Sequence, residues 1–416
     1  VRGFIVDNSI SKKNVLWNMI GTTFNAFNSL FFMMIVTRIN GLKSSGVFTL
    51  AFSLACLLCL IGGYEGRVYQ VTDVKNEYSD VEYIVHRIIT CVIMMVIVIF
   101  YCFIMKYDIY KFIVTVALCL MKCFEVFSDV FYGVLQKDDK LYIVGISLFL
   151  KSVFSVVSFI VIDLITKNLL ISCLILDLVW LVLFLVYDLP KSKCIVKKDS
   201  YSFSNVLRLF KTGFFSFAIL FLSVYLVNAQ KYALDGVVEE SLQAIFGMIL
   251  MPATIISLAG QYLLQPILNT MANLYSNGEK KEFNKIVFKA LLLIVAFGVV
   301  CVIGAYILGI PVLNILYSVN IVDYKLHLLI IIFGAILYSM STLLSAALTT
   351  VRYTFVQFIV FSISSVIAFV ISQILIGQFS IYGAAIAYLI IMACQFILYV
   401  IIYIVIMKKI DFKEVA

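Results

Sequence analysis

Residues 111–136 read KFIVTVALCLMKCFEVFSDVFYGVLQ, an apolar stretch that carries Lys122, Glu125 and Asp129 in its interior. A helix of about 26 residues rises about 39 Å, which is enough to cross the hydrocarbon of a bilayer. The three charged residues are spaced i, i+3 and i+7, so they fall on one helix face. Ionisable groups at this depth usually face a bundle interior or a water-filled cavity. We interpret this face as the lining of a lumen; the alternative is a Lys–Glu pair that only holds helices together.

The rest of the chain is as apolar as this stretch. Its 416 residues are 63% hydrophobic and 13% charged, with a mean hydropathy of +1.10. No soluble globular domain needs so much apolar surface. Long apolar runs, without the alternation of membrane strands, exclude a β-barrel and favour helices. The predicted fold class is therefore an all-α polytopic membrane protein.

The apolar runs predict twelve transmembrane helices, with both termini on the same side of the membrane. Most of the 31 Lys and Arg residues fall in the segments on that side, which predicts cytoplasmic termini. The net charge of +8 then reflects membrane topology, and no nucleic acid partner is expected. The spans cover roughly 14–37, 46–63, 87–105, 111–136, 142–163, 169–187, 207–231, 242–271, 286–309, 326–350, 353–376 and 380–407.

The longest polar connection, DLPKSKCIVKKDSYSFSN at 188–205, falls between the sixth and seventh predicted spans. It divides the chain into an N-terminal six-helix lobe over 1–190, a cytoplasmic basic linker over 191–206 and a C-terminal six-helix lobe over 207–416. Because six is even, the two lobes would have the same orientation, as parallel repeats do.

Several other polar residues lie inside the predicted spans of the first lobe. Asn25 and Asn28 share one face of the first span, where they would contact a polar ligand or bond to a neighbouring helix. Lys151 lies near the middle of the fifth span and Asp177 near the middle of the sixth. Lys151 could pair with Asp177 or with Glu125, and the sequence leaves this choice open.

The second lobe offers carboxamides in place of charges, among them Gln261 and Gln265. The same span contains Pro252 and Pro266, each of which removes a backbone donor and tends to kink a helix. Two kinks in one span are what a hinge in an alternating-access transporter would show, although an inert structural bend would look the same.

Enzyme motifs are missing from the sequence. It contains no G-x-x-x-x-G-K-[ST] phosphate loop, no G-x-S-x-G elbow and no H-E-x-x-H pair. Its two His residues are far apart, and no His/Cys cluster has the spacing of metal ligands. We therefore expect no catalytic residue, no metal and no cofactor, and we favour a transporter over an enzyme.

Two short segments near the N-terminus carry a resemblance to a known family. They are NVLWN at 14–18 and RINGLKSSGVFTLA at 38–51. The chain resembles bacterial polysaccharide flippases of the Wzx type, which often show an Asn-rich first helix, an Arg-x-x-Gly turn and a Gly-x-Phe-x-x-Ala opening to the second helix. These flippases belong to the multidrug/oligosaccharidyl-lipid/polysaccharide exporter superfamily, which also contains multidrug transporters and the lipid II flippase. The motif match covers about the first fifty residues, and the architecture match covers the whole chain.

The resemblance implies a V-shaped bundle of two lobes that alternates access between the two sides of a bacterial cytoplasmic membrane. Its cargo would be an undecaprenyl-diphosphate-linked oligosaccharide, delivered by a monomer to a polysaccharide polymerase, with H⁺ or Na⁺ coupling. It implies diphosphate contacts from Lys122, Lys151, Arg38 and Arg67; sugar contacts from Asn25, Asn28, Gln261 and Gln265; and coupling through Glu125, Asp129 and Asp177.

One departure from the family leaves an alternative open. The flippases are expected to have a clearly cationic cavity, whereas the charges at mid-span are two Lys against three carboxylates. A cation-coupled multidrug exporter of the same superfamily is therefore the second hypothesis. A membrane enzyme acting on lipid-linked sugars is the third, and it lacks a catalytic constellation.

Overall fold

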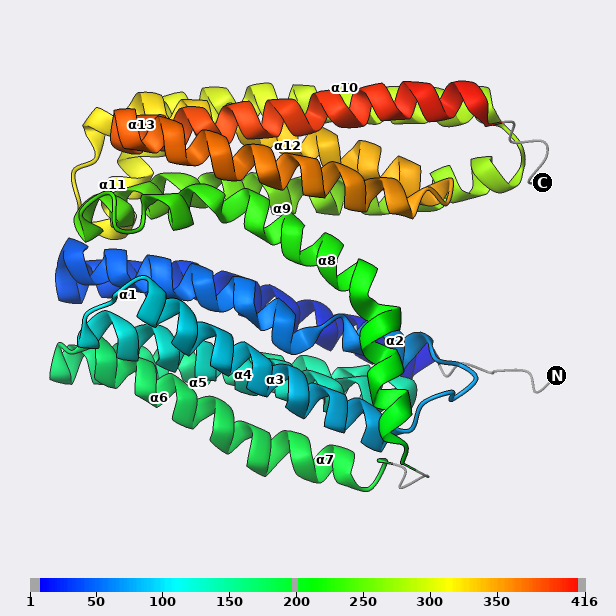
Figure 1. Ribbon diagram of the computed structural model, residues 1–416, viewed down its shortest axis with the longest axis horizontal. Helices are drawn as coiled ribbons and strands as arrows, with labels where there is room; N and C mark the ends of the chain where they lie inside the picture. Colours follow the sequence, from blue (N-terminus) through cyan, green and yellow to red (C-terminus); the bar gives the residue numbers. More distant parts are fainter. Residues whose placement is uncertain (1–7, 197–200, 411–416) are drawn as a thin grey trace. The chain divides into compact units, whose positions relative to one another are not determined.

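The computed structural model describes residues 8–196 and 201–410, and its regular structure there is helical (Figure 1). The chain divides into two compact units, residues 1–221 and 222–416. The first contains α1 (Asn8–Gly63), α2 (Gly66–Thr72), α3 (Asp80–Ile104), α4 (Ile109–Lys137), α5 (Leu141–Thr166), α6 (Leu169–Leu183), the π-helix η1 (Phe184–Asp188), α7 (Leu189–Lys193) and the start of α8 (Phe203–Leu234). The second contains the rest of α8, α9 (Glu240–Ser276), α10 (Lys280–Gly304), η2 (Ala305–Gly309), α11 (Ile310–Tyr317), η3 (Val322–Tyr324), α12 (Lys325–Thr350) and α13 (Thr354–Lys409).

Within residues 8–196 and 201–410, nine helical segments are long and apolar enough to cross a membrane. Two of them, α1 and α13, each cover two predicted spans, and each contains one residue with non-helical backbone angles. These are Gly41, with φ 83°, and Ser380, with φ 53°. The helix α4 is not among the nine, because it carries Lys122, Glu125 and Asp129 in its middle. The count of twelve spans stays a prediction.

In the first unit, α4 packs against α1, α3 and α6, while α1 lies along α5 (Figure 1). The backbones of α1 and α5 approach each other closely at Gly21 and Gly145. A Cβ atom at Gly145 would lie 2.2 Å from the carbonyl of Trp17, so only glycine fits there. Apolar side chains on the other faces of α4, including Val130, Phe131 and Leu135, are buried. The polar stripe of α4 is thereby held inside a packed helical unit.

The boundary between the units falls after Phe221, inside α8, and therefore later than the predicted linker. The first half of α8 belongs to the first unit because it packs on the end of α1. The ring of Phe217 stacks on Tyr64 at a centroid distance of 4.6 Å, and Tyr64 Oη donates to the carbonyl of Phe210 at 3.0 Å. The predicted six-helix lobes stay a prediction, and positions 197–200 of the predicted linker lie outside the described residues.

In the second unit, α12 packs against α9, α10 and α13. Its core includes the buried side chains of Phe283, Leu344 and Tyr399. The helix α9 continues as one element through both Pro252 and Pro266. The predicted hinge at these prolines stays a prediction.

Candidate functional site

The first unit contains a cavity of about 230 Å³ that brings together three of the predicted substrate contacts and one predicted coupling residue. Asn25 and Asn28 reach it from α1, and Lys122 and Glu125 reach it from α4. Its other walls are Ala26, Ser29, Phe32, Phe52, Cys56, Met121 and Trp180. The cavity therefore combines carboxamides and a charged pair with aromatic rings.

The two charged groups of the cavity neutralise each other. Lys122 Nζ lies 2.6 Å from Glu125 Oε2, and Asn25 Nδ2 donates to Glu125 Oε1 at 3.4 Å. The ammonium also lies 5.4 Å from the centroid of the Phe52 ring. Both side chains are partly exposed, 13% for Lys122 and 24% for Glu125. An anionic ligand would have to compete with Glu125 for this lysine.

The next turn of α4 carries a second polar cluster around Asp129. Arg67 Nη1 on α2 lies 3.0 Å from Asp129 Oδ1, and Arg87 Nη2 on α3 lies 3.6 Å from Oδ2. Arg67 also donates from Nε and Nη2 to Gln136 Oε1, at 3.1 and 2.8 Å. Arg87 is buried and donates to the carbonyl of Gly62 at 2.9 Å. Arg87 was not among the predicted site residues, because it lies at the very start of the predicted span 87–105.

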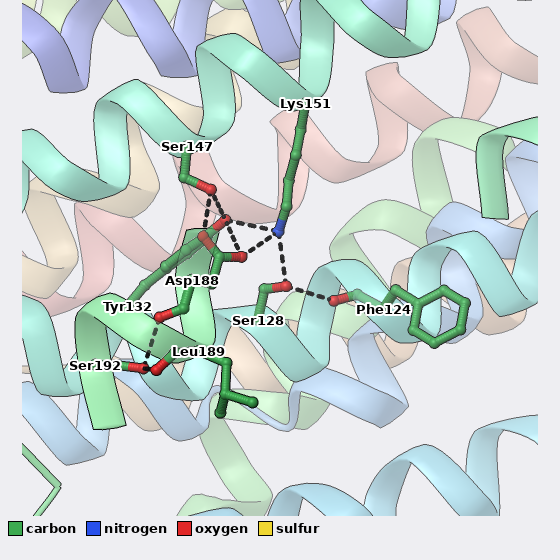
Figure 2. Close-up of polar contacts among 8 residues, drawn as sticks. All are labelled: Phe124, Ser128, Tyr132, Ser147, Lys151, Asp188, Leu189 and Ser192. Carbon is green, nitrogen blue, oxygen red and sulfur yellow. Dashed lines mark hydrogen bonds and ion pairs between the residues drawn. The ribbon is translucent and has the colours of Figure 1, made fainter. Parts of the chain in front are cut away.

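A third cluster, drawn in Figure 2, surrounds Lys151, and the side chain of Lys151 is completely buried. Lys151 Nζ lies 2.5 Å from Asp188 Oδ2 and donates to Ser128 Oγ at 2.7 Å and to Tyr132 Oη at 2.9 Å. Ser147 Oγ donates to Asp188 Oδ1 at 2.5 Å. All three ammonium protons therefore have partners.

This arrangement corrects the predicted pairing of Lys151. Its partner is neither Asp177 nor Glu125, but Asp188 at the end of η1, in the predicted polar connection. Its side chain has 0% exposure and does not line the cavity, and its predicted contact with a diphosphate stays a prediction. Lys151 Nζ lies 4.7 Å from the ring centroid of Trp180, whose indole also lines the cavity. The buried ion pair thus supports a cavity wall without reaching the cavity.

The remaining predicted residues lie elsewhere. Asp177 on α6 is buried, and neither of its carboxylate oxygens has a hydrogen-bond partner in the part of the chain that the structure describes. Arg38 is exposed on α1 and does not line the cavity. Gln261 and Gln265 are exposed on α9 in the second unit. Their predicted contact with the same substrate as Asn25 stays a prediction.

One face of α4 contributes residues to all three clusters. These residues are Lys122, Glu125, Ser128, Asp129, Tyr132 and Gln136. The i, i+3 and i+4 spacings of a helix produce this continuous stripe. Such a stripe can hold a polar group inside a membrane-spanning unit, where lipid alone offers it no hydrogen bonds.

Comparison with known proteins finds a similar sequence and several similar folds. No family model matches the chain. It is 24% identical over 382 residues to the capsular polysaccharide biosynthesis protein CapF of Staphylococcus aureus, covering 90% of this chain and 94% of that protein.

Solved structures of similar fold include the lipid II flippase MurJ in an inward closed conformation, with a TM-score of 0.72 and 15% identity over 93% of this chain and 87% of that one. An inward-facing multidrug resistance transporter of the MATE family has a TM-score of 0.69 and 13% identity, over 95% of this chain and 99% of that one. At identities this low, the structural similarity shows the fold alone. It confirms the predicted all-α, polytopic membrane protein. The resemblance predicted from the sequence is thus confirmed: the chain has the fold of the multidrug/oligosaccharidyl-lipid/polysaccharide exporter superfamily, shared by MATE transporters and MurJ.

Proposed function

We propose that this protein is a flippase that moves undecaprenyl-diphosphate-linked oligosaccharides across a bacterial cytoplasmic membrane, from the cytoplasmic to the outer leaflet, for surface polysaccharide synthesis. The observation that carries the proposal is the polar cavity lined by residues of α1, α4 and α6, which brings Asn25, Asn28, Lys122 and Glu125 together inside a helical unit. The similarity to a capsular polysaccharide biosynthesis protein supports this choice of cargo.

The physical argument concerns the headgroup of the cargo. A sugar and a diphosphate cannot cross about 30 Å of hydrocarbon unaided, because each polar group would lose its hydrogen bonds to water. Asn25 and Asn28 supply amide donors and acceptors for a sugar in the cavity. The lipid tail can remain in the bilayer while the headgroup passes through the protein by alternating access.

The diphosphate would be bound by Lys122, with Arg67 and Arg38 as further candidates. Lys122 becomes available when Glu125 releases it, so protonation of Glu125, or a cation bound there, would couple cargo binding to an ion gradient. Asp129 and Asp177 are the other candidates for coupling by H⁺ or Na⁺. Lys151 is not part of the proposed site, because Asp188 sequesters it.

A cation-coupled multidrug exporter is the second candidate. It is favoured by one observation: the cavity lysine is already neutralised by Glu125, which leaves the cavity without a net positive charge. An enzyme acting on lipid-linked sugars has no comparable support. In either transport role the protein would act as a monomer without a cofactor, and the flippase would pass its cargo to a polymerase.

The test is a strain that lacks this protein, from which undecaprenyl-linked lipids are extracted and analysed by mass spectrometry. We expect one lipid-linked repeat unit to accumulate while surface polysaccharide disappears. The wild-type gene should restore export, and Lys122→Met and Glu125→Gln should not, although both proteins reach the membrane at normal levels. Lys285→Met is the matched control, because Lys285 also pairs with a glutamate three residues away, at 3.1 Å, but on an exposed face of α10.

A different phenotype of the deletion strain would contradict the proposal. If no intermediate accumulates and the strain instead becomes sensitive to cationic drugs, the flippase proposal is wrong and the multidrug exporter takes its place.

A further inference from the structure

The second unit contains a cavity of its own, about 160 Å³ in volume, between α12 and α13. No charged residue lines it. Five wall residues come from α12: Ser341, Thr342, Ser345, Ala346 and Thr349. Phe361, Gln395 and Tyr399 come from α13, on the two sides of the non-helical residue Ser380. None of these residues has a role in the site described above.

The hydroxyl groups of this cavity are arranged as hydrogen-bond acceptors. Ser341 Oγ donates to the carbonyl of Leu337 at 2.9 Å, and Thr342 Oγ1 donates to the carbonyl of Ser339 at 2.8 Å. Since a hydroxyl has one proton, each of these is used within its own helix, and the oxygen lone pairs remain to accept from a ligand.

A further, independent observation is the unpaired side-chain carbonyl of Gln395. Its side chain is 1% exposed and lines the cavity, yet its carbonyl Oε1 has no hydrogen-bond partner within the described residues. A buried acceptor of this kind destabilises a fold unless a ligand or a water satisfies it. The side-chain carbonyl of Gln395 can therefore accept a hydrogen bond from a ligand that occupies the cavity.

The rings of Phe361 and Tyr399 define the shape of the occupant. Their centroids are 6.3 Å apart and their planes meet at 78°, so the cavity has aromatic surface beside its acceptors. The negative face of an aromatic ring attracts polarised C–H groups. A desolvated monovalent cation would leave most of this volume empty, and an anion would find no positive charge.

We propose that this cavity is a subsite for an uncharged sugar ring, whose hydroxyl groups donate to Gln395, Ser341 and Thr342 and whose C–H groups contact Phe361 or Tyr399. This inference rests on the proposed function, in which the cargo carries an oligosaccharide. The first unit would then handle the charged part of the cargo, and the second unit would recognise a neutral part.

The test uses the full-length protein in lipid nanodiscs and saturation-transfer NMR, with methyl α-D-glucopyranoside as the neutral probe and glucuronate as the anionic one. We expect Gln395→Leu to reduce the signal of the neutral probe at least fivefold, and Ala346→Leu to do the same by filling the cavity. Gln373→Leu is the matched control, the same substitution on the same helix at an exposed position that does not line the cavity.

The melting temperature of each variant distinguishes a loss of binding from a loss of folding. Because Gln395→Leu replaces an unsatisfied buried amide with an apolar group, we expect its melting temperature to equal or exceed that of the wild type. An unchanged signal of the neutral probe in Gln395→Leu would overturn the subsite. So would a rise in melting temperature with Na⁺ that Gln395→Leu abolishes, since that would make the cavity a cation site.

The failure of the subsite can be distinguished from the failure of the flippase proposal. If the deletion strain accumulates a lipid-linked intermediate, but Gln395→Leu restores export and binds the neutral probe normally, the subsite is wrong and the flippase stands. If no intermediate accumulates, the flippase proposal is wrong. Loss of the neutral probe in Gln395→Leu would then still identify a site for uncharged polyols.

Discussion

In the first unit, Lys122 and Glu125 of α4 pair with each other, Asp129 contacts arginines of α2 and α3, and Lys151 and Asp188 are buried beside α4. In the second unit, Arg352, in the turn between α12 and α13, is the sole charged residue from Leu326 to Met407. The polar groups there are hydroxyls and amides, several of which bond to their own helix, as Ser341 does.

The difference determines how each unit responds to a mutation. A buried ion pair is balanced only while both partners are present, and the loss of one leaves an uncompensated charge in a medium of low dielectric. A hydroxyl that bonds to its own helix leaves no charge behind when it is removed. Substitutions of polar residues in the first unit should therefore have the larger effects on stability.

The largest effect is expected for Asp188→Leu, which tests the charged side of the comparison most directly. It leaves Lys151, with 0% exposure, without its carboxylate. Breaking a buried pair in this way costs about 3–5 kcal/mol of folding free energy. The measurement is denaturant or thermal unfolding of the purified protein in detergent, followed by circular dichroism.

The control for this prediction is the double variant Lys151→Met/Asp188→Leu, in which neither charge remains. Replacing both partners of a buried pair by apolar groups is often close to neutral. We expect the double variant to recover most of the lost stability. If it is no more stable than Asp188→Leu alone, packing rather than charge holds this cluster together.

A second variant tests the close packing of helices, which does not depend on how many charged residues a unit contains. Gly145→Ala would place a Cβ atom 2.2 Å from the carbonyl of Trp17, so α1 and α5 would have to move apart. Overpacking of this kind costs about 1–3 kcal/mol. Unfolding of the purified variant, compared with the wild type, measures the loss.

Gly304→Ala in the second unit is the matched control, because a Cβ atom there meets nothing within 4 Å. Gly304 lies at the end of α10, where alanine is the better helix former by about 1 kcal/mol at most. Equal destabilisation by the two substitutions would contradict the close approach of α1 to α5.

The comparison also indicates which parts of the molecule the sequence could predict. The helices follow from long apolar runs, and the spacing of Lys122, Glu125 and Asp129 predicts one polar face of α4. Both are local properties of the chain, governed by helix geometry. The structure brings Asn25 and Asn28 together with Lys122 and Glu125 in one cavity, and their predicted contacts with a substrate stay a prediction.

Contacts between distant elements could not be predicted in this way. The partner of Lys151 is Asp188, 37 residues further along the chain, and only the packing of η1 beside α4 and α5 brings the two together. Likewise, Phe217 of α8 stacks against Tyr64, more than 150 residues earlier in the chain, a contact that no local sequence pattern indicates. The polar composition of 188–205 indicated a boundary in this region, but not where α8 passes from one unit to the next.

A third variant separates stability from transport within the first unit. Lys122 and Glu125 keep 13% and 24% of their side chains exposed, so Lys122→Met should cost less folding free energy than Asp188→Leu, which breaks a pair with almost no exposure. Export should nevertheless be lost, because the proposed diphosphate contact is removed. Unfolding and accumulation of lipid-linked intermediates are measured on the same variant. If Lys122→Met unfolds easily but still exports, the Lys122–Glu125 pair has a structural role and does not bind the diphosphate.

The smallest effect is expected for Lys285→Met, which applies the same substitution to an ion pair on the surface of the second unit. Lys285 and Glu282 lie 3.1 Å apart with more than half of each side chain exposed, 57% and 53%. Solvent and salt screen such a pair, so its loss should cost about 0.5 kcal/mol at most and leave export unchanged. Unfolding at low and high ionic strength checks the estimate, because a screened pair contributes less at high salt. A loss as large as that of Asp188→Leu would contradict the comparison, since it would mean that sequence spacing, rather than burial, determines what an ion pair contributes in this protein.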